Sequence, residues 1–453
     1  MSRLQNTKYF YSLVFLEITI LTFLNYNANL MSGLIPLYLD FAQFFSSNFD
    51  LNLVFNSNNY TFPMWGYGFI LLALKEKFII IFFQQLLTFF TIILLDNLLI
   101  KESLLKQKII FRFLILLIPH WYLFQTSVWP YSINSNLLVI SSIYLVKYMI
   151  SYNLKYLCIS AVIFGISLNL RSDYYYFQIF IVLILFFNIL KGKRSIIHIL
   201  IYIFILNILL LPWGIYTYKK TNHYLQTSTN AGHVFYISLG QLPNNLWKIT
   251  AKDEDSSMKS ILEKRLNSKN VNSLSYESNI YLMNEWKKNV FKNPLEYIKK
   301  CGFNIFQLFT TPFYSGSIEK MFANETELNK IKRNIKYLYV NYNIIKLIKY
   351  ILFDKGSIYV SNFFLNLLGV IFFLVFSFTL ILLLIKKSLL TLLKNPFYKI
   401  SIFIILYQIT MNVMVFHMPI YNSNIILFYV FALSAMLERL FTIYRTTKLA
   451  CLQ

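Results

Sequence analysis

The chain has 453 residues, of which 57% are hydrophobic and 13% charged, and its mean hydropathy is +0.54. This composition excludes an ordinary soluble protein, because such proteins carry about 25% charged residues. The formal net charge of +23 would favour nucleic acid as a partner of a soluble chain, but here Lys and Arg lie between apolar segments, where they orient spans and contact lipid headgroups. We therefore predict an integral membrane protein that contacts membrane lipids and no nucleic acid.

The first half of the chain predicts alternation between spans and loops. Residues 27–62 follow the first span and contain no Lys or Arg, which places them outside by the positive-inside rule. The apolar piece 63–74 is too short to cross about 30 Å of hydrocarbon, so we expect a re-entrant or interfacial element there. The expected crossings are 10–26, 77–100, a third ending near His120, a fourth ending near Lys147, a fifth ending at Arg171, a sixth ending at Lys191 and a seventh over 195–211.

The second half predicts one larger outer segment followed by further spans. Residues 217–300 are polar with mixed charges, and we expect an extracytoplasmic segment with short helices, since long loops translocate regardless of charge. Residues 301–312 and 337–353 either both cross or both lie at the interface, because the alternation of sides requires an even number of crossings there. Three firm spans are expected after them, over 361–385, 400–416 and 425–440.

These segments together predict an all-α polytopic membrane protein with ten or twelve transmembrane helices. Its parts are an N-terminal transmembrane module over 1–216, an extracytoplasmic segment over 217–300 and a C-terminal transmembrane module over 301–453. Basic loops alternate with short loops that hold little or no Lys and Arg, so both termini are expected in the cytoplasm. We expect the protein in the inner or cell membrane of a bacterium.

Ionisable side chains at membrane depth are costly and are therefore candidates for function. Glu17 and Asp96 lie within predicted spans, where we expect them to form hydrogen bonds at helix interfaces. The main acids of the outer loops are Asp40, Asp50 and Asp173. A carboxylate in such a loop can deprotonate an acceptor hydroxyl as general base.

The outer loop Arg171-Ser172-Asp173 has two interpretations. It is either an ordinary short loop with a local ion pair or part of a site for a lipid-linked substrate, whose phosphate a guanidinium binds in a bidentate mode. The three cysteines, Cys158, Cys301 and Cys451, are scattered without pairing or metal-ligand spacing, so no disulfide framework is expected. No cofactor is predicted with certainty, and a divalent metal remains compatible with the site.

Several short motifs follow one another in a recognisable order. Tyr38 with Ala42, Thr61 through Tyr67 and Gly165 through Arg171 precede the end of the seventh span. The stretch after that span contains Pro212-Trp213, Tyr218-Lys219, Ser228-Thr229-Asn230-Ala231-Gly232 and Gly240 through Asn244. In this order the motifs resemble membrane glycosyltransferases of the GT-C superfamily, which contains protein mannosyltransferases and lipid A aminoarabinose transferases.

The resemblance implies a GT-C-like bundle whose outer loops form a groove. It also implies transfer of a sugar from a polyprenyl-phosphate-linked donor to an extracytoplasmic acceptor, which is a glycan, a lipid or a protein. The residue roles that it implies are Asp40 as general base, with Asp50 and Asp173 as alternatives, Arg171 and Lys219 on the donor phosphate, and Tyr38, Tyr131, Asn230 and His233 along the groove.

The chain departs from the family pattern around Tyr38. The family places its acid a few residues before this tyrosine, whereas residues 33–36 here contain no acid and Asp40 follows Tyr38 by two positions. In a helix Asp40 would lie about 200° around the axis from Tyr38. Asp40 therefore replaces the family's acid only if the loop is irregular.

Two other functions remain open. One is an outer-leaflet polysaccharide polymerase or ligase, which would share the topology and the lipid-linked substrate. The other is a non-catalytic membrane scaffold, which the missing acid favours.

Overall fold

The computed structural model describes residues 2–26, 38, 64–105, 108–190, 196–253, 256–266, 272–314, 330, 331, 333, 334, 337, 338, 343–354 and 360–450. These residues form helices and connecting turns without any β-strand, which confirms the all-α class. Within them, six helices are long and apolar enough to cross a membrane. They are α5 (Lys77–Lys101), α8 (Pro130–Ser151), α11 (Ile197–Thr221), α18 (Val360–Ile385), α20 (Pro396–Met414) and α22 (Ile426–Ala450).

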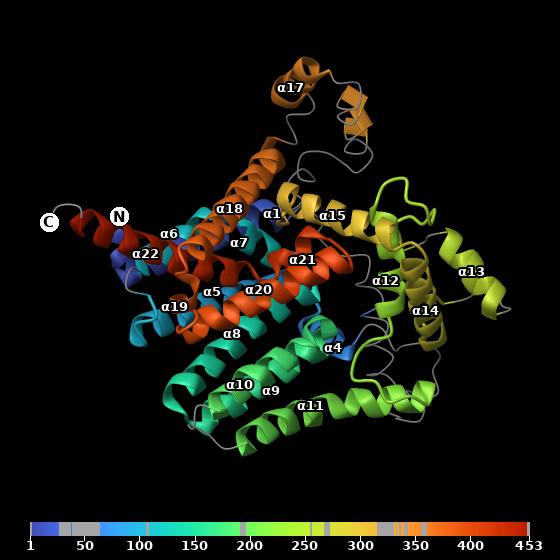
Figure 1. Ribbon diagram of the computed structural model, residues 1–453, viewed down its shortest axis with the longest axis horizontal. Helices are drawn as coiled ribbons and strands as arrows, with labels where there is room; N and C mark the ends of the chain where they lie inside the picture. The colour runs from blue at the N-terminus through green and yellow to red at the C-terminus, as the bar shows by residue number, and fades with distance from the viewer. Residues whose placement is uncertain are drawn as a thin grey trace.

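The remaining helices are shorter or less apolar. They are α1 (Thr7–Tyr26), α4 (Trp65–Leu74), α6 (Lys108–Leu117), α7 (His120–Gln125), α9 (Leu154–Leu170), α10 (Phe177–Leu190), α12 (Ala231–Ser238), α13 (Ser256–Leu266), α14 (Tyr276–Lys292), α15 (Pro294–Thr310), α17 (Ile344–Phe353), α19 (Leu389–Leu392) and α21 (Pro419–Ser423). Figure 1 shows the two chain termini at one end of the molecule and α12, α13 and α14 at the opposite end. The polar segment that the sequence sets apart thus caps one end of the helical bundle.

Several boundaries differ from the prediction, and α22 runs to Ala450 instead of ending near residue 440. The seventh predicted span continues through Pro212 and ends at Thr221, because buried Trp213 anchors this part of α11 through a bond from its indole Nε1 to the carbonyl oxygen of Thr227 (3.1 Å). A proline inside such a helix is tolerated where neighbouring groups satisfy the backbone. The third predicted crossing is two short helices, α6 and α7, with Pro119 at the N-cap of α7.

The bundle interior carries a buried polar network that links α5, α7 and α8. Asn136 donates from Nδ2 to Thr88 Oγ1 (3.1 Å) and to Gln125 Oε1 (3.0 Å), and Gln84 donates to the carbonyl oxygen of Gln125 (2.8 Å). All four side chains are fully buried. Such a network fixes one register of the three helices, because a slipped register would leave buried polar groups without partners.

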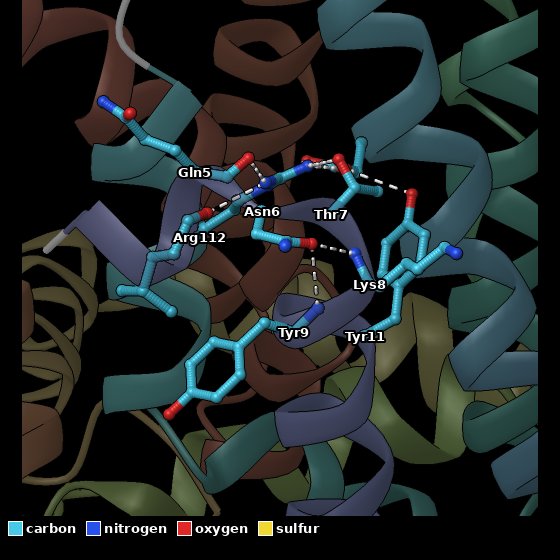
Figure 2. Close-up of polar contacts among 9 residues, drawn as sticks. Gln5, Asn6, Thr7, Lys8, Tyr9, Tyr11 and Arg112 are labelled. Atoms are coloured by element: carbon cyan, nitrogen blue, oxygen red, sulfur yellow. Dashed lines mark hydrogen bonds and ion pairs between the residues drawn. The ribbon is translucent and has the colours of Figure 1, made fainter.

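A buried ion pair fastens the N-terminal segment to the bundle, at the end that carries the termini (Figure 2). Arg112 of α6 donates from Nε and Nη2 to the carboxylate of Asp96 of α5 (2.9 and 2.6 Å), and neither side chain is exposed. Its Nη1 donates to the carbonyl oxygens of Leu4 (2.8 Å) and Gln5 (3.0 Å), and its Nη2 to Thr7 Oγ1 (3.0 Å). Asp96, expected at a helix interface, is thus the counter-ion of an arginine that orders the entry to α1.

Candidate functional site

The predicted loop after α9 forms the centre of the candidate site. Helix α9 ends at Leu170, and Arg171 takes an extended conformation before the short 3₁₀ turn Ser172–Tyr174. The guanidinium of Arg171 donates from Nε to Asp173 Oδ2 (2.9 Å) and from Nη2 to Oδ1 (3.2 Å). The arginine side chain is 11% exposed and the aspartate side chain 34%, so the pair lies at the edge of the packed interior.

Tyrosine rings surround the guanidinium of Arg171. Its central carbon lies 3.9 Å from the centroid of the Tyr131 ring, and that ring packs against Tyr421 with centroids 5.7 Å apart. The Tyr38 hydroxyl forms a hydrogen bond with the same arginine. Burial alone would lower the pKa of Arg171, but Asp173 and the nearby phenols raise that pKa well above its ordinary value. The arginine is therefore a permanent cation held against the face of the Tyr131 ring.

The turn that carries Asp173 is held by the C-terminal helices. Tyr407 of α20 donates its hydroxyl to the carbonyl oxygen of Asp173 (2.6 Å). Tyr174 donates to Gln408 Oε1 (2.9 Å) and accepts from Asn424 Nδ2 (3.0 Å), and all three of these side chains are buried. The two halves of the chain thus meet at this turn and fix its conformation.

A cavity of about 170 Å³ adjoins the ion pair. Arg171 and Asp173 line one part, and Ser228 and Asn230 line another, where Ser228 Oγ donates to Asn230 Oδ1 (2.7 Å) and lies 3.2 Å from Ser172 Oγ. The other lining residues are Ser172 and Tyr176 from the segment after α9, Thr227 from the segment before α12, and residues of α12, α20 and the segment 415–424: Ala231, Val234, Phe235, Tyr407, Gln408, Met411, Val415, Phe416, Tyr421 and Asn424. A cation, a carboxylate, amides, hydroxyls and aromatic rings thus face one small space.

The structure brings together several of the predicted residues. Arg171, Asp173 and Asn230 line the cavity. Tyr131 and Tyr38 do not line it, but both contact Arg171.

Other predicted residues lie elsewhere. His233 lies on α12 and pairs through Nε2 with Asp253 Oδ1 (3.3 Å), and it is not part of the cavity lining. Lys219 is exposed on the last turn of α11 and does not line the cavity either. Asp40 and Asp50 lie outside the described residues.

Residues of the C-terminal module complete the cavity and were not predicted. Gln408, Tyr421 and Asn424 line it together with Tyr407. Gln408 lies within α20, a helix apolar enough to cross a membrane, and a polar side chain at membrane depth is itself a signal of function. Within the part of the chain that the structure describes, no group of three His, Cys, Asp or Glu could hold a metal ion.

The helices and the cavity define the class of the protein. Its long apolar helices support an all-helical membrane-spanning protein, and a polar cavity lies against α12, which Figure 1 shows at the end opposite the termini. Comparison of the chain with family models, with curated proteins and with solved structures found no match.

Proposed function

We propose that this chain is a membrane glycosyltransferase that moves a sugar from a polyprenyl-phosphate-linked donor to an extracytoplasmic glycan, lipid or protein. The observation that supports this proposal is the cavity in which Arg171 and Asp173 lie beside amides, hydroxyls and aromatic rings. Amides and hydroxyls match the hydroxyl groups of a sugar, aromatic faces match its apolar face, and an arginine matches a phosphate.

Arg171 is proposed to hold the donor phosphate, and Asp173 to act as the carboxylate of the site. Asp173 is the candidate acid that lines the cavity among the described residues, which do not include Asp40 and Asp50. Both of its oxygens accept hydrogen bonds from Arg171 in the free protein, so both are engaged there. A phosphate competes for the same bidentate donors, so donor binding would release the carboxylate for proton transfer.

The proposed reaction balances in one displacement. The bond between the anomeric carbon and the phosphate oxygen breaks, and the phosphate leaves with the electron pair on its polyprenyl carrier. The bond from the acceptor oxygen to the anomeric carbon forms, and the hydroxyl proton passes to Asp173. Arg171 would stabilise the charge that develops on the leaving phosphate.

A non-catalytic scaffold is the second candidate, and one observation favours it. Both oxygens of Asp173 are engaged by Arg171, and Tyr407 holds the backbone of the same turn. A pair that serves only to fasten the turn would have the same geometry.

The test is a transfer assay in proteoliposomes with a panel of polyprenyl-phosphate sugars. Loss of a general base reduces the rate by about 100-fold or more, so Asp173→Asn should lose transfer to that extent. Arg171→Lys keeps the charge but loses the bidentate fork, and we expect a higher KM for the donor. Asp253→Asn is the matched control, because Asp253 is an exposed acid outside the cavity.

Two outcomes would contradict the proposal. Transfer at the wild-type rate by Asp173→Asn would exclude this residue as the base. Absence of transfer by the folded wild-type protein with every donor of the panel would favour the scaffold.

A further inference from the structure

Helix α15 has its polar residues inside and its apolar residues outside. Glu296, Lys300 and Asn304 follow one another at intervals of four, so they share one face of the helix, and they are 7%, 0% and 0% exposed. The opposite face carries exposed apolar side chains, namely Leu295 (73%), Ile298 (63%), Ile305 (44%), Phe306 (62%) and Phe309 (37%). This distribution is the reverse of that in a helix on the surface of a soluble domain.

The buried face is fastened by specific bonds to the end of α20. Lys300 donates from Nζ to the carbonyl oxygens of Met414 (3.0 Å) and Val415, and Asn304 donates from Nδ2 to that of Asn412 (3.0 Å). The last carbonyl groups of a helix have no partner within it, so these side chains satisfy α20 where it ends. Helix α15 therefore cannot rotate its apolar face inward without leaving these carbonyls unpaired.

The exposed face is continuous with the surface of an expected membrane span. Phe309 packs against Phe373 of α18 with ring centroids 5.2 Å apart, and Figure 1 shows α15 beside α18. The outward side chains of α18 are apolar as well, including Phe363, Phe364, Ile371, Leu374 and Phe378, all of which are exposed. A contiguous apolar surface of this kind marks a contact with lipid or with another protein.

The charge pattern along α14 and α15 favours lipid. Lys288, Lys292 and Lys299 are exposed and lie near the N-terminal end of α15, next to exposed Phe291 and Leu295. The C-terminal half of α15 contains no charged residue beyond Lys300. Basic residues followed by an apolar face are typical of a helix at the lipid headgroups, where lysines reach anionic groups and apolar side chains enter the acyl region.

We propose that the exposed face of α15, together with Phe291, is inserted in the lipid leaflet at the α12–α14 end of the protein. Lys300 lies level with the end of α20, while Leu308 and Phe309 share an apolar cleft with Ile409 and Thr410, so the helix descends beside α20. Leu295 thus lies at the headgroups and Phe306 among the acyl chains. At 1.5 Å per residue, these two positions are separated by about 16 Å along the helix. The proposal is independent of the proposed catalytic activity.

The experiment measures collision of spin labels with oxygen and with a water-soluble nickel chelate in proteoliposomes. Single labels are placed by Leu295→Cys, Ile298→Cys and Phe306→Cys in a chain whose three cysteines are replaced (Cys158→Ser, Cys301→Ala and Cys451→Ser). Glu263→Cys on α13 is the exposed polar control, and Phe378→Cys on α18 is the apolar span control. We expect an oxygen-to-nickel ratio severalfold above that at Glu263, rising from Leu295 to Phe306 toward the value at Phe378.

Two results would overturn the inference. Ratios equal to that at Glu263 at all three positions would show a face open to water. Low collision with both reagents would show that a protein, such as a second copy of this chain, covers the face. If the cysteine-free chain does not fold, benzoylphenylalanine is introduced at Leu295, Phe306 and Glu263 of the wild-type background for photo-crosslinking. We then expect lipid adducts at Leu295 and Phe306 and none at Glu263.

Discussion

The buried ion pair of Asp96 and Arg112 offers a direct test of what fastens the N-terminal segment. Replacing Asp96 by Leu leaves the guanidinium of Arg112 buried without its counter-ion, because both side chains are fully buried. Removing one partner of such a pair costs about 3–5 kcal/mol. The remaining acceptors of Arg112, the carbonyl oxygens of Leu4 and Gln5 and the hydroxyl of Thr7, are neutral and offset only part of that cost. We therefore expect Asp96→Leu to destabilise the protein by about 3 kcal/mol.

The assay is reversible unfolding of the detergent-solubilised chain in sodium dodecyl sulfate, followed by the fluorescence of its six tryptophans. Glu263→Leu on α13 is the control, since an exposed acid should change the free energy of unfolding by less than about 0.5 kcal/mol. The double variant Asp96→Leu with Arg112→Leu should recover much of the loss, because it removes the uncompensated charge as well.

A loss in Asp96→Leu no larger than that of the control would refute the reasoning. It would mean that Arg112 reaches solvent or another anion once the carboxylate is gone. A double variant less stable than Asp96→Leu alone would also contradict it, because the guanidinium would then stabilise the N-terminal segment without its counter-ion.

Two further predictions concern single residues. A Cβ at Gly66 would lie 2.7 Å from the carbonyl oxygen of Asn169, so Gly66→Ala should push α4 away from α9. In the same unfolding assay we expect the free energy of unfolding to fall by about 1–3 kcal/mol. The control is Gly302→Ala, because a Cβ at Gly302 meets no atom within 4 Å. Burial lowers the pKa of His417 to about 4, so the unfolded chain binds more protons than the folded chain between about pH 4 and 6.5. The free energy of unfolding should therefore fall by about 2 kcal/mol from pH 7 to pH 5 because of this residue. His417→Gln should remove that part of the pH dependence, and a variant with the wild-type pH profile would contradict the prediction.

Hydropathy and the distribution of charges were sufficient to predict the all-helical membrane class and the ends of several helices. The firm span 361–385 corresponds to α18, and the piece 63–74, judged too short to cross, corresponds to the ten-residue helix α4. These features depend on composition over many neighbouring residues, which is what a sequence displays directly. Six helices meet the criterion for crossing within the described residues, against the ten or twelve spans expected, because helices such as α9 and α10 are shorter than a full span.

The candidate site was predicted only in part, because its residues come from distant segments. Arg171 and Asp173 are neighbours in sequence, so their pairing could be anticipated as a local ion pair. The contribution of α20 could not, since nothing in the sequence states that Tyr407 contacts the backbone of Asp173, 234 residues away. Likewise His233, expected in the groove, instead faces Asp253, a residue that no motif includes.

Helix α15 shows why the ambiguity over 301–312 could not be resolved from periodicity. An amphipathic pattern predicts two opposite faces but does not state which faces the protein. The usual assumption turns the apolar face of a helix toward the protein. In α15 the polar face is turned inward, because Lys300 and Asn304 donate to carbonyl oxygens at the end of α20 that have no partner within that helix. If lipid covers this face, as we propose, it removes the cost of exposing the apolar side chains to water, and the polar contact decides the orientation. In a membrane protein the ends of neighbouring helices, rather than hydropathy alone, therefore determine which face of a short helix is buried.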